Sequence, residues 1–405
     1  MALIVQKYGG TSVGSIDRIR KVAKRVMDKR NAGHQLVVVL SAMGKTTDEL
    51  VKLAKEISPH PDERDLDMLV STGEQVSIAL LSMALQREGC RAVALTGWQA
   101  GILTDCCHGD ARIRHFENNR ICGHLQEGKV VIVAGFQGVD EHGEITTLGR
   151  GGSDTSAVAL AASLGAERCE IYTDVTGVFT ADPRLVPTAQ KLSAISYQDM
   201  LDLAQLGAGV LHPRSVETAR KRHVRLVVRS SFSDEEGTYV GADVPAQAES
   251  VARGIAHQEQ ISILWVKGRE IHRRTPMLTG NLREAGVMAN AVLHGTDLLS
   301  FPVATEQHKK AAAFLQEQQE SLGFDEMEAE HGFAMVSLVG VSRHASSKVP
   351  KTIKRKMKAL QVPIRWFHQS ERKVSIALPA EQVKTAVRAL HRELGLDAGE
   401  KLAVK

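Results

Sequence analysis

A glycine-rich segment, Thr146-Thr-Leu-Gly-Arg-Gly-Gly-Ser-Asp-Thr155, leads directly into an apolar segment, Ser156-Ala-Val-Ala-Leu-Ala-Ala-Ser-Leu164. Apolar residues recur at helical spacing from Ala157 to Leu164, which predicts a helix that starts near Ser153. The glycines before it allow a sharp turn and a close approach of the backbone to a ligand. Because a helix N-terminus presents unpaired N–H groups and a partial positive charge, this segment predicts an anion site.

Arg150 and Asp154 add two opposite charges to this turn. A guanidinium group can hold a carboxylate with two hydrogen bonds, so Arg150 suits an anionic substrate. The segment by itself leaves a simpler interpretation open. In that interpretation Ser153 or Asp154 only caps a helix, and Arg150 is solvated.

The beginning of the chain repeats the order of strand, glycine turn and helix. Residues 3–8 form a short apolar run, Gly9-Gly-Thr-Ser12 follows, and residues 16–26 carry an apolar helical face. Lys7 stands at the end of the expected strand, where ligands of open α/β sheets bind. A lysine at this point suits phosphate oxygens, although an ordinary connection with an exposed lysine is the alternative.

The pattern between residues 1 and 230 alternates strands with helices. The longest expected helix runs from about residue 65 to 87, and a polar linker is expected at 233–249. Such alternation predicts an α/β fold with a largely parallel sheet covered on both faces. The other expected strands are Leu36–Leu40, Ala92–Leu95, Val130–Ala134, Cys169–Thr173 and Val224–Val228.

Beyond the linker the pattern changes to small α+β units. One unit is expected to begin at a strand over residues 261–266, and the last unit has the order βαββα. That order is one strand short of the ferredoxin-like unit, and a strand at 251–256 could supply it. The last unit has strands at 332–341, 362–368 and 373–378 and helices at 348–360 and 380–394, whereas the earlier one continues with a helix at 277–285 and a strand at 291–293.

Composition favours an intracellular enzyme. A chain of 405 residues is too long for one ordinary core, and its net charge of +4 is mild and dispersed. We therefore expect no nucleic-acid partner. Neither a signal peptide nor a membrane span is evident, and five cysteines without regular spacing fit a reducing compartment, so a cytoplasmic location is expected.

Two local patterns resemble ligand sites and are rejected. Cysteines and histidines gather at residues 106–124, but adjacent cysteines rarely ligate one ion and the usual paired spacing is absent, so no metal site is expected. Gly44-Lys45-Thr46 looks like the end of a phosphate-binding P-loop. That motif needs a glycine five positions earlier, where Val39 stands.

Taken together, the motifs of the first 240 residues resemble the aspartate kinases of the amino-acid kinase family. The matching stretches, in family order, are Lys7–Ser12, Ser41–Gly44 with Thr46–Asp48, Thr72–Glu74, Gly135–Gly138, Thr147–Asp154, Tyr172–Val175, Thr180–Arg184 and Leu211–Arg214. The resemblance implies an αβα sandwich with the amino-acid kinase fold, followed by two ferredoxin-like ACT domains. The implied domains are residues 1–245, 246–333 and 334–405, with the strand 251–256 lent to the last.

The resemblance also implies the reaction. Aspartate kinases use ATP and Mg²⁺ to phosphorylate the side-chain carboxylate of L-aspartate to 4-phospho-L-aspartate, which begins lysine, threonine and methionine biosynthesis. That carboxylate has a reference pKa of about 3.9, so no general base is needed at neutral pH. Catalysis then consists of alignment and charge neutralisation between two anions.

The resemblance assigns roles residue by residue. Lys7 bridges the β- and γ-phosphates, and Asp154 orients Lys7. Arg150 and Ser153 hold the α-carboxylate of aspartate, Glu74 pairs with its ammonium, and Thr47 with Ser41 steadies the reacting carboxylate. Taken singly, Glu74 and Thr47 could instead cap helices. The implied nucleotide contacts are Lys7, Gly9, Gly10, Ser12, Thr173, Asp174, Phe179, Asp182 and Arg184.

Some positions depart from the family pattern. Phe179 stands where many members have tyrosine, and Gly209 where many have lysine. Neither ACT turn, at 267–273 or 342–346, has the usual acid followed by Pro-Gly, so an effector is left unidentified. A homodimer or larger homo-oligomer through the ACT domains is implied by the resemblance. Two alternatives stay open, a kinase of an aspartate analogue and a non-catalytic amino-acid sensor.

Overall fold

The computed structural model describes residues 1–242, 244, 251–287, 289 and 292–397. The chain forms two compact units. The first unit contains residues 1–178, 191–201 and 209–244, and the second contains residues 179–190, 202–208 and 245–405. Parts of the predicted linker and of the predicted strand 291–293 lie outside the described residues.

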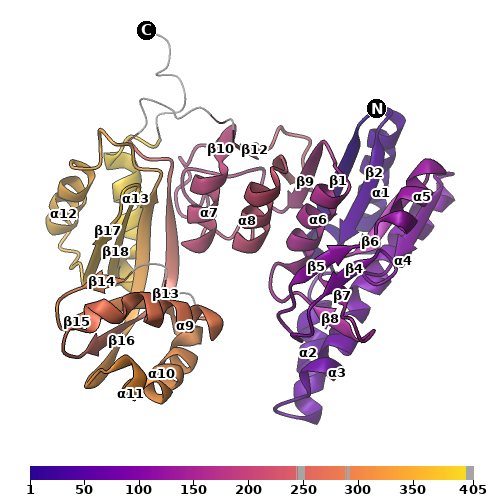
Figure 1. Cartoon of the computed structure of the whole chain (residues 1–405). Coiled ribbons are helices and arrows are strands. Elements are labelled where there is room, and N and C mark those ends of the chain that lie inside the picture. The colour runs from indigo at the N-terminus through magenta and orange to yellow at the C-terminus, as the bar shows by residue number, and fades with distance from the viewer. Residues whose placement is uncertain (243, 245–250, 288, 290–291, 398–405) are drawn as a thin grey trace, which may run out of the picture. The chain divides into compact units, whose positions relative to one another are not determined.

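The first unit is built on an eight-stranded sheet with the order β10-β12-β11-β9-β1-β2-β6-β3 (Figure 1). All neighbouring strands are parallel except the antiparallel pair β11 and β12. Every residue of Val130–Ala134 is buried, as expected for a parallel strand with helices on both faces. The strands are β1 Leu3–Tyr8, β2 Gln35–Leu40, β3 Ala92–Leu95, β6 Val130–Ala134, β9 Arg168–Thr173, β10 Ala194–Ser196, β11 Leu226–Ser230 and β12 Thr238–Gly241.

Helices cover the two faces of this sheet. On one face, α1 and α4 pack Ile19 and Leu81 into a buried cluster with Ile4 and Tyr8 of β1. The apolar helix α6 contacts β1, β2 and β9. The helices are η1 Gly10–Val13, α1 Ile16–Asn31, α2 Thr46–Ile57, α3 Glu63–Val70, α4 Thr72–Arg87, α5 Asn119–Gln126, α6 Gly152–Ser163, α7 Tyr197–Gln205 and α8 Pro213–Arg222.

The structure confirms the predicted α/β architecture and corrects several details. The predicted strands 3–8, 92–95 and 130–134 have the observed bounds, whereas the strand expected at 224–228 begins two residues later. The single helix expected at 65–87 is two helices, α3 and α4, joined at Ser71. The expected linker at 233–249 was partly wrong, since β12 lies within it and pairs with β11.

A second, small sheet was not predicted. It has the order β5-β4-β7-β8, with strands β4 Ile102–Thr104, β5 Ile113–Phe116, β7 Gln137–Val139 and β8 Ile145–Thr147. Three of these strands have only three residues, too few for a period-2 pattern to be recognised. Its position matters because β8 leads straight into the glycine-rich segment at 148–152.

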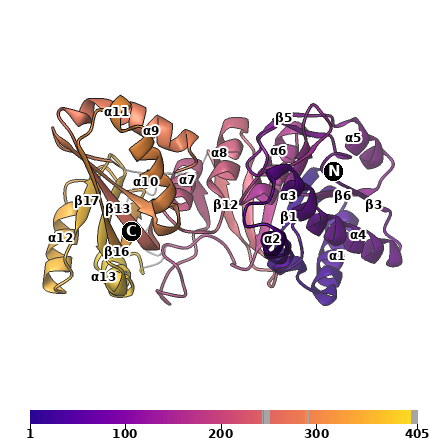
Figure 2. The ribbon, with the colours of Figure 1, turned by 90° about the horizontal axis from the view of Figure 1, so that it is seen from below.

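The second unit contains a six-stranded sheet with the order β14-β15-β13-β16-β18-β17. Strands β13 and β16 are each 14 residues long and pair antiparallel, with the register shifting between Gln258 and Ile263. Helices α12 and α13 lie together beside one half of the sheet (Figure 2). The elements are β13 Gly254–Lys267, η2 Ile271–Arg274, α9 Thr275–Glu284, β14 Leu293–His294, β15 Leu298–Ala304, η3 Thr305–Gln307, α10 His308–Glu317, α11 Gln319–Leu322, β16 Glu326–Val339, α12 Val349–Ala359, β17 Trp366–Gln369, β18 Lys373–Pro379, η4 Ala380–Gln382 and α13 Val383–Glu393.

The two halves of that sheet have separate apolar cores. One core includes Leu264, Phe301 and Leu315, and the other includes Val336, Ile353 and Leu390. The strand expected at 251–256 is observed only from Gly254, as the start of β13, where Ile255 pairs with Leu338 of β16. One half has β13, α9, β14, β15, α10 and β16 in the ferredoxin-like order βαββαβ, and in the other half the start of β13 joins β16, α12, β17, β18 and α13, as the sequence predicted.

A short segment from the middle of the chain belongs to this second unit. Residues 179–190 place Ala181, Leu185 and Val186 in the core that α12 and α13 cover. The Thr180 hydroxyl lies 2.9 Å from Nε2 of His391, and the Leu185 carbonyl accepts a 2.7 Å hydrogen bond from Arg388. The segment is therefore fixed by the second unit, which local sequence patterns did not indicate.

Candidate active site

Lys7 and Asp154 form a nearly buried ion pair in the first unit. Successive side chains of a strand point to opposite faces, so Tyr8 faces α1 and Lys7 faces α6. The Lys7 Nζ lies 2.7 Å from Oδ1 of Asp154, and the two side chains are 12% and 11% exposed. Asp154 belongs to the first turn of α6, where a carboxylate is favoured by the helix dipole. The fold thus brings two oppositely charged residues, far apart in the sequence, into direct contact.

The glycine turn after β1 is joined to the loop after β2. The Gly44 N–H donates to the Gly10 carbonyl over 3.0 Å, and the Ser41 N–H donates to the Tyr8 carbonyl over 3.1 Å. A Cβ on Gly10 would lie 2.8 Å from the Ala42 carbonyl oxygen, so only glycine allows this approach. Gly9 leaves space beside the Lys7 ammonium, since an added Cβ would lie 3.3 Å from Nζ.

Glu74 is an almost fully buried carboxylate with one oxygen unpaired. It lies in the first turn of α4, one residue after Gly73, whose missing side chain lets the helix approach Ala42. Oε1 accepts a 2.9 Å hydrogen bond from the Ala42 N–H, while buried Oε2 has no partner among the described residues. Burial raises the pKa of Glu74 to about 7, against the opposing effect of the Ala42 hydrogen bond. An unpaired buried carboxylate oxygen is poised for a cation.

The glycine-rich segment turns into α6 as predicted, with the helix starting at Gly152. Ser153 is buried against Gly135, at the end of β6, where a Cβ would lie 2.8 Å from its hydroxyl. Gly151 has a φ of 69° and lies against His212, the residue that caps α8. Burial lowers the pKa of His212, and the Asp154 carboxylate opposes that shift. His212 belongs to a quoted family motif, although no role was predicted for it.

Substitution of Gly151 by alanine is expected to displace this turn. The left-handed φ strains any residue with a Cβ, and that atom would lie 2.2 Å from the His212 ring. We expect kcat/KM for aspartate to fall at least about tenfold, because small displacements of binding groups have large effects. Steady-state kinetics with Gly123→Ala as the control test this. Gly123 is helical and a Cβ there meets nothing within 4 Å, so its kinetics should be unchanged.

Asp67, which was not predicted as a site residue, forms hydrogen bonds with β8, the strand that leads into the glycine-rich segment. Its buried carboxylate accepts hydrogen bonds from the N–H and hydroxyl groups of Thr147, at the end of β8. The same carboxylate accepts from the Gly109 N–H and lies 3.0 Å from Nδ1 of His108. One side chain of α3 therefore joins β8 to the loop at 105–111.

Arg214, from the end of the His-Pro-Arg motif, provides a second brace. Its guanidinium donates to the Leu148 carbonyl over 3.2 Å and to the Asp110 carboxylate over 2.6 Å. Gly149 is packed on the same loop, since a Cβ there would lie 3.0 Å from an Asp110 carboxylate oxygen. The contacts of Asp67 and Arg214 join residues far apart in the sequence, so the sequence alone could not predict them.

The remaining residues predicted for the substrate lie around these loops in the first unit. The Arg150 side chain is exposed and makes no ion pair among the described residues, so its guanidinium is free to bind a carboxylate. Thr47 lies in the first turn of α2 and is half-buried. The Ser41 carbonyl accepts a 2.9 Å hydrogen bond from the Ser77 hydroxyl, which fixes the loop from α4.

The residues predicted for the nucleotide are divided between the two units. In the first unit, Ser12 lies 2.5 Å from the hydroxyl of Ser231, and Thr173 donates to Asp174 over 3.0 Å. Phe179, Asp182 and Arg184 belong to the segment 179–190 of the second unit, where Arg184 and Asp182 pair with each other. Ser231 was not predicted as a site residue. The structure indicates it through its contact with Ser12, which was predicted.

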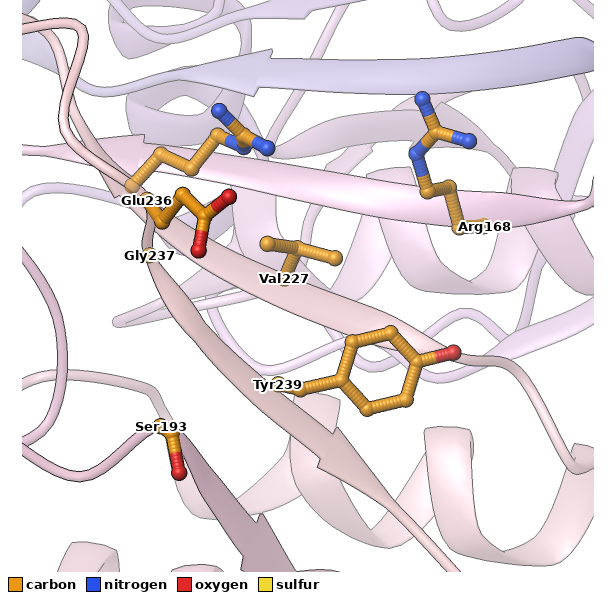
Figure 3. A pocket seen from close by; sticks show the side chains of 7 residues that line it. Arg168, Ser193, Val227, Glu236, Gly237 and Tyr239 are labelled. Carbon is orange, nitrogen blue, oxygen red and sulfur yellow. The ribbon is translucent and has the colours of Figure 1, made fainter.

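A separate shallow cavity of about 360 Å³ lies on the sheet of the first unit. Figure 3 shows Arg168 and Tyr239 beside it, and Val227 between them. Arg168 is in register with Ile4, which faces α1, so this is the face of the sheet opposite Lys7. The cavity is thus distinct from the site around Lys7 and Asp154.

Two further observations concern metal ligands and membrane spans. Among the residues that the structure describes, no three His, Cys, Asp or Glu side chains gather to hold a metal ion. One helical stretch, Glu63–Arg87, has the length and composition of a membrane span, contrary to the expectation that none would. Half of its most apolar window is buried, and α4 contributes Ile78, Leu81 and Leu85 to the core, which is typical of a core helix.

Comparison with known proteins agrees with this geometry. A profile of the amino acid kinase family matches residues 2–230. An aspartokinase of Geobacillus stearothermophilus is 49% identical and covers 100% of both chains, and one of Bacillus sp. (strain MGA3) is 48% identical over 98% of each. The chain therefore belongs to the amino acid kinase family. Within that family, its full-length relatives show that it belongs to the aspartokinases.

Solved structures give the same result for the fold. The crystal structure of E. coli aspartokinase III with aspartate and ADP has a TM-score of 0.84 and 24% identity, over 97% of this chain and 100% of that one. Aspartate kinase from Synechocystis is 42% identical, with a TM-score of 0.55, over 97% of this chain and 69% of that one. The predicted amino-acid kinase fold with ferredoxin-like C-terminal units is confirmed.

Proposed function

We propose that Lys7, held by Asp154, carries the phosphoryl transfer of this aspartokinase, which phosphorylates the side-chain carboxylate of aspartate with ATP. The supporting observation is the 2.7 Å ion pair at the end of β1, beside the two joined loops. The ammonium neutralises charge on the transferred phosphoryl group, while Asp154 fixes its position. Neither residue removes a proton, because the attacking carboxylate is already ionised at neutral pH.

Aspartate is recognised through its two fixed charges. Glu74 pairs with the α-ammonium through its free Oε2, which otherwise remains buried without a partner among the described residues. Arg150 and Ser153 hold the α-carboxylate at the start of α6, where N–H groups also point outward. Ser41 and Thr47 then steady the side-chain carboxylate that attacks the phosphorus atom.

ATP is held by Lys7 and the turn Gly9-Gly10 with Ser12, and by Thr173 and Asp174. The family resemblance also assigns Phe179, Asp182 and Arg184 to the nucleotide. Mg²⁺ neutralises phosphate charge when it is bound, and it usually keeps several water ligands and binds substrate phosphates.

The domain division is proposed as residues 1–245 for the kinase domain and 246–333 and 334–405 for two ACT domains. The start of β13, from Gly254, pairs with β16 and would complete the last domain. We further propose a homo-oligomer through the ACT domains and a cytoplasmic location. The role in lysine, threonine and methionine biosynthesis follows from the reaction.

A panel of substrates tests the ammonium contact directly. With Mg²⁺ and ATP, we expect L-aspartate to be turned over and N-acetylaspartate to be used at least about tenfold less efficiently, because its amide leaves the buried Glu74 carboxylate unpaired. Phosphorylation is measured by hydroxamate formation and coupled ADP release. Equal kcat/KM values for both acids would contradict the proposed contact and favour a kinase of an acylated analogue.

A further inference from the structure

The loop that follows β4 exposes two adjacent thiols. Cys106 and Cys107 are both exposed and reduced, whereas Cys90 and Cys169 are buried and Cys122 is half-buried. We propose that Cys106 and Cys107 form a vicinal dithiol, a modification site whose closure into a ring weakens aspartate binding. The effect on aspartate rests on the proposed role of Arg150, but capture of a reagent by the two thiols does not.

The thiols lie between two fixed ends of one loop. Before them, the Asp105 N–H donates to the Arg112 carbonyl and its carboxylate accepts from the Arg112 N–H, which closes the loop at its base. After them, the Gly109 N–H and the His108 ring are held by the buried Asp67 carboxylate. Strain introduced at residues 106–107 is therefore transmitted to its anchors.

The same anchors hold the glycine-rich segment. Asp67 also holds Thr147, and the Ala111 N–H donates to the Thr147 carbonyl over 2.9 Å. Arg214 joins Asp110 to the Leu148 carbonyl, two residues before Arg150. A change at the dithiol therefore reaches the turn that carries Arg150, whereas Lys7 lies on β1 and Asp154 lies inside α6, past the residues that these anchors hold. This predicts a change in KM for aspartate and not in kcat.

The modifying chemistry balances with a small disulfide as the oxidant. One thiolate attacks the disulfide, forms a mixed disulfide and releases one thiolate of the reagent. The neighbouring thiolate then attacks the protein sulfur of that mixed disulfide and releases the second, so the reagent is reduced to two thiols. The protein loses two protons and two electrons and gains one S–S bond. An exposed, strained bond of this kind is readily reduced again, which suits a reversible modification.

Phenylarsine oxide tests the dithiol because its arsenic atom condenses with two nearby thiols and releases one water. We expect one arsenical per chain by intact-protein mass spectrometry, retained against excess monothiol and removed by excess dithiothreitol. Cys106→Ser and Cys107→Ser should each abolish retention, and Cys122→Ser should leave it unchanged. Retention by both single serine variants, or its absence in the unchanged protein, would overturn the site.

The coupling is tested on the same samples with aspartate kinetics. We expect bound arsenical, or oxidation by a small disulfide, to raise KM for aspartate at least about fivefold, the lower end of typical coupling between sites. The kcat should stay within about twofold, dithiothreitol should restore KM, and the serine variants should not respond. Stoichiometric capture with unchanged KM would overturn the coupling. Untreated protein with no turnover of aspartate would instead contradict the proposed function.

Discussion

Replacement of Lys7 by alanine is expected to lower kcat at least about a hundredfold, with a smaller change in KM for ATP. Removal of one preorganised charge-stabilising group typically has an effect of this size, since its interaction strengthens as charge develops in the transition state. The Lys7 side chain is 12% exposed and its ammonium pairs with Asp154, so its charge is held in a fixed position. Steady-state kinetics at saturating ATP and aspartate measure this.

Two variants separate this catalytic effect from a general loss of structure. Lys21→Ala removes an exposed lysine from α1 of the same unit and should leave kcat unchanged. Asp154→Asn keeps the size of the side chain and should lower kcat less than Lys7→Ala, because it loosens the ammonium without removing it. A Lys7→Ala protein with near-normal kcat would show that the catalytic cation lies elsewhere.

The sequence predicts the frame of the first unit well for physical reasons. Central strands such as Val130–Ala134 are continuous apolar runs bounded by glycine, and such runs are distinctive. Lys7 and Asp154 were predicted to act together by family resemblance, and the structure brings their charges to 2.7 Å. The order of the motifs along the chain therefore carried information that no local pattern contained.

What could not be predicted depends on contacts between distant segments. Strand β12 lies in a polar stretch and forms because β11 and β10 flank it, and neither relation is visible in residues 238–241 alone. Asp67 and Arg214 likewise act through residues that are distant along the chain. Within the segment 179–190, Thr180–Arg184 match a motif of the amino-acid kinase family. The apolar residues of the segment nevertheless belong to a core of the second unit.

Substitution of Glu74 by glutamine is expected to raise KM for aspartate by about 10–100-fold with little change in kcat. A hydrogen bond to a charged group contributes about 1.5–3 kcal/mol, and the ammonium is held equally in the ground and transition states. The amide oxygen of the new side chain would still accept from the Ala42 N–H, so we expect the fold to be retained. Glu88→Gln, which replaces an exposed acid at the end of the same helix, is the matched control and should bind aspartate normally.

The pH dependence of aspartate binding provides the sharper test of Glu74. Because burial raises its pKa to about 7, the carboxylate is ionised above that pH and increasingly neutral below it. Only the ionised form pairs with the substrate ammonium, which stays protonated in this range. We therefore expect kcat/KM for aspartate to fall close to tenfold for each pH unit below about 7, and the Glu74→Gln profile to lack this step. A wild-type profile that is flat between about pH 6 and 8, or an unchanged step in the variant, would assign the ammonium contact to another residue.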